Sequence, residues 1–254
     1  MTQEAGKFVG KVALVTGGAS GIGHGAATQL SAMGCQVILT DIAREQGQEI
    51  ADRIGAHFLI QDVASEASWR SVIGTIEERY GRLDILVNNA GIYAAGNIET
   101  TDLLSWNRLQ EVNAGSVFLG CKYGIGLMKR TGGSIINVSS GAALRPTSSA
   151  AAYSASKSAV WNLTRTTALY CAEQAYGIRC NSIHPGLVET PMVAERARDE
   201  SERQELYGKY AAMHPVGRMA RISDVVAAII FLASDEAEYL TGVALPVDGG
   251  YAIG

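Results

Sequence analysis

Short apolar runs alternate with longer stretches of helical periodicity along most of this chain. Val12–Thr16 is an apolar run followed by two glycines, which is typical of a strand buried on both faces of a parallel sheet. Gly34 ends the first helical stretch before a second apolar run begins. The pattern predicts strands at residues 12–16, 36–40, 56–60, 85–87, 134–138, 178–183 and 243–247. It predicts helices at about residues 22–33, 43–54, 65–80, 103–128, 150–175 and 194–206.

This alternation of strands and helices determines the expected fold class. The connections between successive units are short, so we expect an α/β protein with one doubly wound parallel sheet of the Rossmann type. No Pro- or Ser-rich linker and no shift in composition divides the chain, so residues 1–254 are predicted to form a single domain. Residues 1–8 are expected to be a flexible tail.

Composition narrows the range of partners. The chain has 254 residues, of which 47% are apolar and 18% charged, and a formal net charge of −4, which argues against a nucleic-acid-binding surface. Four cysteines without CxxC spacing indicate reduced thiols in a cytoplasmic protein. The N-terminus has no signal-peptide pattern, and the longest strongly apolar stretch, residues 225–233, is too short to span a bilayer. We therefore expect no membrane partner.

The histidines give no indication of a metal site. His24, His57, His184 and His214 form no HxxxH motif and no cluster with cysteine. We expect no bound metal, and we expect each histidine to lie at the surface or in a turn.

A glycine-rich segment follows the first predicted strand and opens the first predicted helix. It runs from Thr16 to Gly23, and its glycines at positions 17, 21 and 23 depart from the GxGxxG spacing of the common dinucleotide fingerprint. At this place in a βα unit, backbone N–H groups can hold a pyrophosphate. The predicted cofactor contacts here are Gly17, Ser20, Gly21, Ile22 and Gly23. A glycine-rich turn without a ligand is the alternative.

Asp41 follows the second predicted strand and favours NAD over NADP. A carboxylate there can accept hydrogen bonds from the adenosine ribose hydroxyls and would repel a 2′-phosphate. No Arg or Lys occurs between Gly17 and Gly23, and position 42 is Ile. Asp62 and Val63, after the third strand, are predicted to meet the adenine edge, although Asp62 could simply cap the strand end.

Tyr153 and Lys157 form the most informative pair of the chain. Four residues separate them, so a helix would place both side chains on one face. A nearby ammonium stabilises phenolate over phenol, so we expect Lys157 to lower the pKa of Tyr153 and make it a proton donor and acceptor. An exposed helical face without chemistry is the alternative for the pair considered alone.

Taken together, these motifs resemble the short-chain dehydrogenase/reductase family, in its branch of about 250 residues. The resemblance covers the whole chain and includes Asn88–Gly91 and His184–Gly186. It implies a seven-stranded sheet of order 3-2-1-4-5-6-7 with helices on both faces. Residues 120–140 also resemble bacterial hydroxysteroid dehydrogenases of this family. A homotetramer is implied as well.

The resemblance also implies the role of each site residue. Tyr153 would be the acid/base, Lys157 would bind the nicotinamide ribose, Ser140 would hold the substrate oxygen, and Asn113 would position Lys157. Ser139 competes with Ser140 for its role. The remaining implied cofactor contacts are Asn89, Ala90, Gly91, Pro185, Gly186, Val188 and Thr190.

The segments near the implied site indicate the kind of substrate. Small or apolar residues would surround it, namely Ala142, Leu144, Leu187, Met192 and Met213, and none of them is charged. We therefore expect an uncharged, hydrophobic substrate that is alicyclic or steroid-like. Residues 190–214 would form a lid over it, with a solvated helix face as the alternative.

The resulting functional prediction is an NAD-dependent alcohol dehydrogenase or ketoreductase. It would interconvert a secondary alcohol and a ketone by hydride transfer. The first alternative is a 3-oxoacyl-[acyl-carrier-protein] reductase, which usually uses NADPH, so Asp41 speaks against it. The second is a non-catalytic dinucleotide sensor, against which the presence of Asn113, Ser140, Tyr153 and Lys157 speaks.

Overall fold

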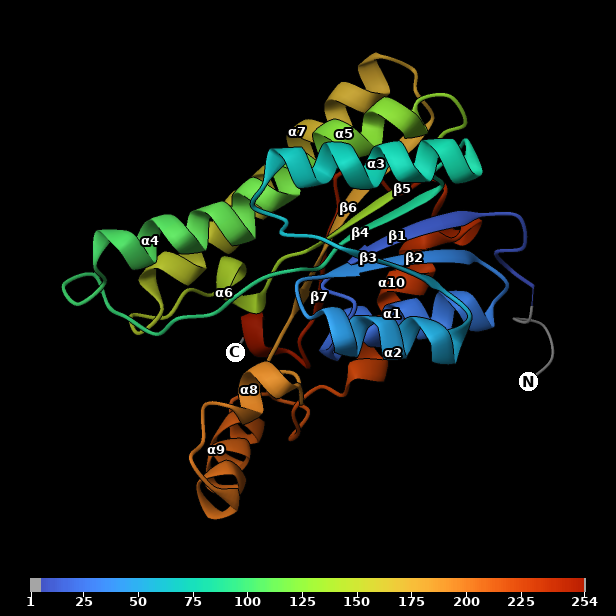
Figure 1. Cartoon of the computed structure of the whole chain (residues 1–254). Helices are drawn as coiled ribbons and strands as arrows, with labels where there is room; N and C mark the ends of the chain where they lie inside the picture. The colour runs from blue at the N-terminus through green and yellow to red at the C-terminus, as the bar shows by residue number, and fades with distance from the viewer. Residues whose placement is uncertain (1–5, 254) are drawn as a thin grey trace.

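A single parallel sheet organises the molecule in the computed structural model, which describes residues 6–253. Its strand order is β3-β2-β1-β4-β5-β6-β7, which confirms the implied topology (Figure 1). The strands are β1 Val12–Thr16, β2 Gln36–Asp41, β3 His57–Ile60, β4 Ile85–Asn88, β5 Gly133–Val138, β6 Ile178–Pro185 and β7 Ala244–Val247. Each apolar run that predicted a strand therefore forms one, with ends shifted by no more than two residues.

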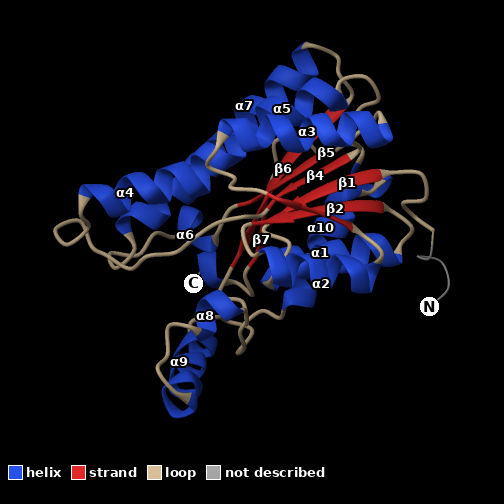
Figure 2. Ribbon diagram, viewed as in Figure 1, coloured by secondary structure: helices blue, strands red, loops and turns tan. Residues whose placement is uncertain are grey.

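Helices cover both faces of this sheet (Figure 2). The longer ones are α1 Gly21–Ala32, α2 Arg44–Ile54, α3 Glu66–Tyr80, α4 Leu103–Leu109, α5 Ser116–Met128, α7 Ala151–Glu173, α9 Glu200–Ala212 and α10 Ile222–Ala233. Two short helices, α6 Gly141–Leu144 and α8 Pro191–Ala194, follow β5 and β6. In the part of the chain that the structure describes, no helix combines the length and the apolar character needed to cross a membrane.

Two hydrophobic clusters, one on each face, bury the sheet. Successive residues of β1 alternate between them: Ala13 and Val15 pack with α1, α2 and α10, while Val12 and Leu14 pack with α3, α5 and α7. This alternation follows from the two-residue period of a strand, and it explains why the buried strands have continuous apolar sequences.

Three helical features differ from the sequence pattern. The helix predicted at residues 194–206 is replaced by α8 and α9, which are separated by a non-helical segment. The helix predicted at residues 103–128 contains a π-helical turn, Gln110–Gly115, between α4 and α5. The apolar spacing is helical on both sides, so the pattern gave no sign of the extra residue in this turn. The apolar stretch at 225–233 belongs to α10, a helix that the sequence analysis did not predict; it packs on α1 and lies in one of the hydrophobic clusters.

The start of the chain and the segment after β6 bear on two further predictions. Phe8 is buried, and its N–H donates to the Met33 carbonyl oxygen at 3.0 Å, so the described part of the predicted tail packs on the fold. Residues 1–5 lie outside the described residues. Helices α8 and α9 form an arm that extends away from the sheet in Figure 1, and no residue of α9 is buried.

Candidate active site

The candidate site is a cavity of about 460 Å³ at the carboxyl ends of the strands, where open α/β sheets bind their ligands. The segments that follow β1, β2, β4, β5 and β6 all contribute to its wall. Most predicted site residues line it, namely Gly17, Ser20, Gly21, Ile22, Asp41, Asp62, Val63, Asn89, Ala90, Gly91, Ser140, Ala142, Tyr153, Lys157, Pro185, Gly186, Leu187, Val188, Thr190, Met192 and Met213. Gly23, Asn113 and Leu144 are not in its lining.

The glycine segment forms a tight loop between β1 and α1. Gly17 has a φ of +66° and Gly21 a φ of +54°, which side chains other than glycine rarely adopt. A Cβ on Gly23 would overlap the Gly17 carbonyl oxygen, so this glycine permits the close packing of α1 on the loop. Gly23 therefore supports the conformation of the loop without lining the cavity.

Asn89 ties this loop to the end of β4. Its side-chain Nδ2 donates to the carbonyl oxygen of Thr16 at 2.9 Å, and its backbone N–H donates to the Thr16 hydroxyl at 3.0 Å. The same hydroxyl accepts the N–H of Ala90 at 3.1 Å. The Asn89 side chain thus holds the loop in place as well as lining the cavity.

The geometry around Asp41 and the start of α1 fits a dinucleotide. The two carboxylate oxygens of Asp41 accept one backbone N–H each, from Ala19 at 3.0 Å and Ala43 at 3.1 Å, and retain lone pairs for ribose hydroxyls. Ser20 begins α1 without a side-chain cap, and the first turn has no acidic residue. The first N–H groups of α1 therefore remain available to an anionic pyrophosphate.

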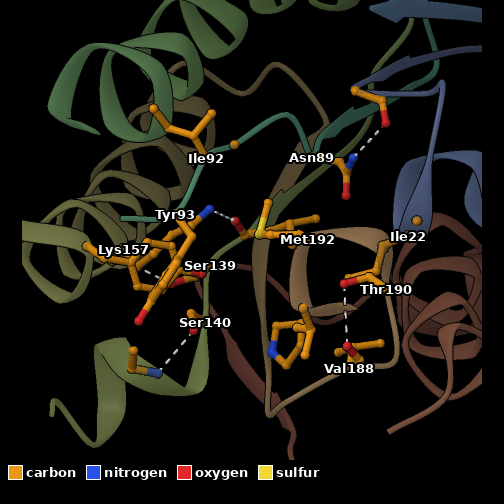
Figure 3. A pocket seen from close by; sticks show the side chains of 18 of the residues that line it. Ile22, Asn89, Ile92, Tyr93, Ser139, Ser140, Lys157, Val188, Thr190 and Met192 are labelled. Atoms are coloured by element: carbon orange, nitrogen blue, oxygen red, sulfur yellow. Dashed lines mark hydrogen bonds between the residues drawn. The ribbon is translucent and has the colours of Figure 1, made fainter. Parts of the chain in front are cut away.

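Ser139 and Ser140 are separated by their hydrogen bonds. The Ser139 hydroxyl is buried and donates to the Lys157 carbonyl oxygen at 2.8 Å, which commits it to α7. The Ser140 hydroxyl lies at the start of α6, where it accepts the N–H of Ala142 at 3.1 Å (Figure 3). It lines the cavity and is close enough to Tyr153 to act on its pKa. Ser140 is therefore the serine placed to hold a substrate oxygen.

Lys157 is anchored next to the predicted acid/base. Its Nζ donates to the Val138 carbonyl oxygen at 3.0 Å and lies 5.9 Å from the centroid of the Tyr153 ring. Only 4% of Lys157 is exposed, and burial lowers its pKa to about 8. The aliphatic part of the Lys157 side chain is thus buried, and its ammonium group lies at the cavity.

Burial raises the pKa of Tyr153 in this structure, and the expected lowering is wrong. The neighbouring Ser140 hydroxyl and the positive charge of Arg196 act in the opposite direction, but they do not outweigh burial. Lys157 is not among the groups that shift this pKa. The phenol is therefore the favoured form in the protein alone, which suits proton donation.

Asn113 lies in the π-helical turn and is fully buried. Its Oδ1 accepts the N–H of Ile92 at 2.8 Å, and its Nδ2 donates to the Ile92 carbonyl oxygen and the Ser156 hydroxyl, both at 3.0 Å. A Cβ on Gly91 would lie 3.1 Å from Asn113 Oδ1 and 3.3 Å from Lys157 Nζ. Asn113 therefore fixes the loop after β4 against α7 beside the Lys157 ammonium.

Two histidines are buried, contrary to the expectation from sequence. His184 lies within β6, where its imidazole contacts the Ser182 hydroxyl at 2.9 Å and the Ser140 carbonyl oxygen at 3.2 Å; burial lowers its pKa to about 4. His214, after α9, bonds to the Tyr210 carbonyl oxygen at 2.7 Å and to the N–H of Leu187 at 3.1 Å. These hydrogen-bonding partners offset the free-energy cost of burying the two imidazoles.

Sequence reasoning missed several residues of the wall, among them Tyr93, Arg108, Arg196, Tyr210 and Tyr251. Tyr93 packs edge-on against Tyr153 with ring centroids 5.1 Å apart, and the Arg196 guanidinium lies 3.7 Å from the Tyr93 centroid. Tyr93 lies two residues after the Asn88–Gly91 motif, and this closeness to a predicted cofactor segment was the sequence signal for it. The wall therefore carries charge on the side that the sequence analysis described as uncharged.

Comparison with known proteins supports a nicotinamide-dependent oxidoreductase. A family model described as "Enoyl-(Acyl carrier protein) reductase" matches residues 17–252. The chain is 43% identical to the 3-beta-hydroxysteroid dehydrogenase of Comamonas testosteroni over 244 residues, which are 95% of this chain and 96% of that protein. It is 38% identical to the trans-4-hydroxycyclohexanecarboxylate dehydrogenase of Sinomonas cyclohexanicum over 265 aligned positions, covering 100% and 97% of the two chains.

Two further matches bear on cofactor and fold. The NADP-dependent (R)-specific alcohol dehydrogenase of Lentilactobacillus kefiri is 37% identical, over 96% of this chain and 98% of that protein. Among solved structures, ligand-free aldohexose dehydrogenase of Thermoplasma acidophilum superposes with a TM-score of 0.90 at 33% identity, over 98% of this chain and 96% of that chain.

Proposed function

Because this chain belongs to the short-chain dehydrogenase/reductase family, we propose that it is an NAD-dependent dehydrogenase that interconverts a secondary alcohol and a ketone. One observation carries this proposal: Ser140, Tyr153 and Lys157 line the same cavity as the glycine loop and Asp41. Alcohol oxidation requires groups that exchange a proton with the substrate and a site for the dinucleotide cofactor, and both must lie in one cavity.

In this proposal, the chain positions the substrate oxygen and handles its proton. A bound nicotinamide supplies the acceptor or donor of hydride. Ser140 holds the oxygen by a hydrogen bond, and Tyr153 gives its phenolic proton to the oxygen in reduction or receives the proton in oxidation. Lys157 lines the same cavity, where its ammonium would hold the ribose of a bound nicotinamide close to the phenol.

The preference for NAD rests on Asp41 and on a glycine loop without basic residues; Arg44, the nearby base at the start of α2, does not line the cavity. The Asp41 carboxylate lines the cavity, and the loop from Gly17 to Gly23 carries no Lys or Arg that could bind a 2′-phosphate. Ile42, which also lines the cavity, adds no charge. The NADP-dependent relative from Lentilactobacillus kefiri makes this preference worth measuring directly.

The proposed substrate has an alicyclic body. Ala142, Leu187, Met192, Val193 and Met213 line the wall near Tyr153 and offer an apolar surface to a ring system. Two relatives at 43% and 38% identity carry names of enzymes for steroid and cyclohexane alcohols, which agrees with such a surface. An uncharged substrate is not part of the proposal, because Arg196 also lines the cavity.

Initial rates with matched cofactors test the proposal. Cyclohexanols and hydroxysteroids are oxidised with NAD⁺ or NADP⁺, and we expect kcat/KM to favour NAD⁺ by at least about tenfold. Asp41→Ala should reduce that ratio by weakening NAD⁺ binding and removing the repulsion of the 2′-phosphate. Preference for NADP⁺ together with activity on 3-oxoacyl thioesters would favour the acyl-carrier-protein reductase, and NADH binding without turnover would favour the sensor.

A further inference from the structure

Arg196 occupies an unusual position in the wall of the cavity. It lies between α8 and α9, in the arm that extends from the sheet (Figure 1). Its Cζ is 3.7 Å from the centroid of the Tyr93 ring, and its Nη1 donates to the Tyr210 hydroxyl at 3.4 Å. The arm therefore brings a guanidinium back to the ring that packs against Tyr153.

This guanidinium has no acidic partner among residues 6–253. Its Nε is buried and makes no hydrogen bond there. Neighbouring arginines of the same arm are paired, Arg198 with Glu202 and Arg203 with Glu200. A buried charged donor without an acceptor is costly, and arginine cannot discharge itself by losing a proton. At the cavity wall, Arg196 thus offers a positive charge that no carboxylate of the described residues neutralises.

The position of this charge relative to Tyr153 sets the length of a matching ligand. Tyr93 lies between the two groups, 5.1 Å from the Tyr153 ring and 3.7 Å from the Arg196 guanidinium. The guanidinium is therefore no farther from the acid/base ring than these two distances combined. One six-membered ring with substituents at opposite ends, lying alongside Tyr93, spans a distance of this size, and Leu187, Met192 and Met213 give the same cavity apolar surface.

We propose that Arg196 binds a carboxylate and that the substrate is an alicyclic hydroxy acid, with its hydroxyl at Tyr153 and its carboxylate at the arm. This inference rests on the proposed function, since it assigns the second end of the same substrate. A planar guanidinium matches a planar carboxylate, and a single arginine with one neighbouring hydroxyl provides fewer donors than a phosphate would engage.

Matched substrates and variants test the assignment. The substrates are 4-hydroxycyclohexanecarboxylate and its neutral carboxamide, with NAD⁺. The variants are Arg196→Met, which keeps most of the stem and removes the charge, Arg196→Lys, which keeps the charge, and Arg198→Met as control. The Arg198 side chain is 89% exposed and does not line the cavity.

The wild type should prefer the carboxylate by about 10- to 100-fold in kcat/KM, as expected for a charge-assisted hydrogen bond. Arg196→Met should abolish this preference, mainly through a higher KM for the carboxylate, while leaving the carboxamide within about threefold. Arg196→Lys should retain part of the preference, and Arg198→Met all of it. Equal kcat/KM for the two substrates in the wild type, or an equal loss for both in Arg196→Met, would show that the guanidinium only clamps Tyr93.

A binding measurement separates this inference from the proposed function. Cyclohexanecarboxylate, which has no hydroxyl to oxidise, is titrated into the enzyme with NADH by calorimetry. Binding that Arg196→Met abolishes and Arg198→Met retains supports the anion site, even when no secondary alcohol is turned over and the proposed function fails. Undetectable binding to the wild type overturns the anion site, even when neutral secondary alcohols are good substrates.

Discussion

Ser139 and Ser140 illustrate how neighbouring residues of one type acquire different tasks at the end of a strand. Both serines follow β5, and Ser140 has extended backbone, in which successive side chains point in different directions. The Ser139 hydroxyl meets the backbone of α7, and the Ser140 hydroxyl meets the cavity. From the sequence alone, either serine could hold the substrate oxygen, because a shift of one residue in the strand register would exchange their positions.

Alanine variants of this pair should separate stability from catalysis. Ser140→Ala should lower kcat/KM by about 100-fold, because the substrate oxygen loses a hydrogen bond, with little effect on stability. Ser139→Ala should instead lower the free energy of unfolding by about 1–2 kcal/mol, since the Lys157 carbonyl loses a buried donor. Steady-state kinetics and urea unfolding of both variants provide the check. The reverse pattern would assign the substrate oxygen to Ser139.

The junction of β1 and α1 is the element on which cofactor binding depends. Gly23 lets the helix approach the loop, and Asn89 fixes the loop to β4. Neither contact follows from the spacing of glycines in the sequence, which indicated only that the loop is tight. Sequence predicted direct cofactor contacts for both residues, whereas the structure adds a supporting role behind the loop.

Two glycine-to-alanine variants test this junction. In Gly23→Ala, the new Cβ would overlap the Gly17 carbonyl oxygen, so the loop must shift; NADH affinity should fall at least about tenfold and stability should fall as well. Gly74→Ala is the control, because no atom lies within 4 Å of its Cβ position in α3. It should raise stability by up to about 1 kcal/mol and leave NADH affinity unchanged. Fluorescence titration and thermal melting measure both effects, and unaltered NADH affinity in Gly23→Ala would contradict the role of this loop.

At the scale of the whole molecule, the sheet was predictable and the contacts of the arm were not. Buried parallel strands have continuous apolar sequences, so each of the seven strands could be recognised locally. The contacts of Arg196 and His214 join segments far apart in the chain, and no local pattern encodes them. The π-helical turn that carries Asn113 could not be predicted either, because the helical spacing of apolar residues continues on both sides of it.

The remaining predictions about the whole molecule concern its surroundings. A homotetramer and a cytoplasmic location stay predictions, and so does the role of residues 190–214 as a lid. The arm has no buried residue in α9, yet Arg196 and Met213 of the same segment line the cavity. This combination is what the predicted lid would require.

The turnover of Tyr153→Phe tests the central claim most directly. With saturating NAD⁺ and an alicyclic alcohol, we predict a fall in kcat of about 100- to 10,000-fold, because the variant lacks the group that exchanges a proton with the substrate oxygen. Tyr93→Phe, in the ring packed 5.1 Å from Tyr153, is the matched control and should retain kcat within a few-fold. NADH affinity and melting temperature should be nearly unchanged in both variants. A Tyr153→Phe enzyme with turnover close to that of the wild type would contradict the account.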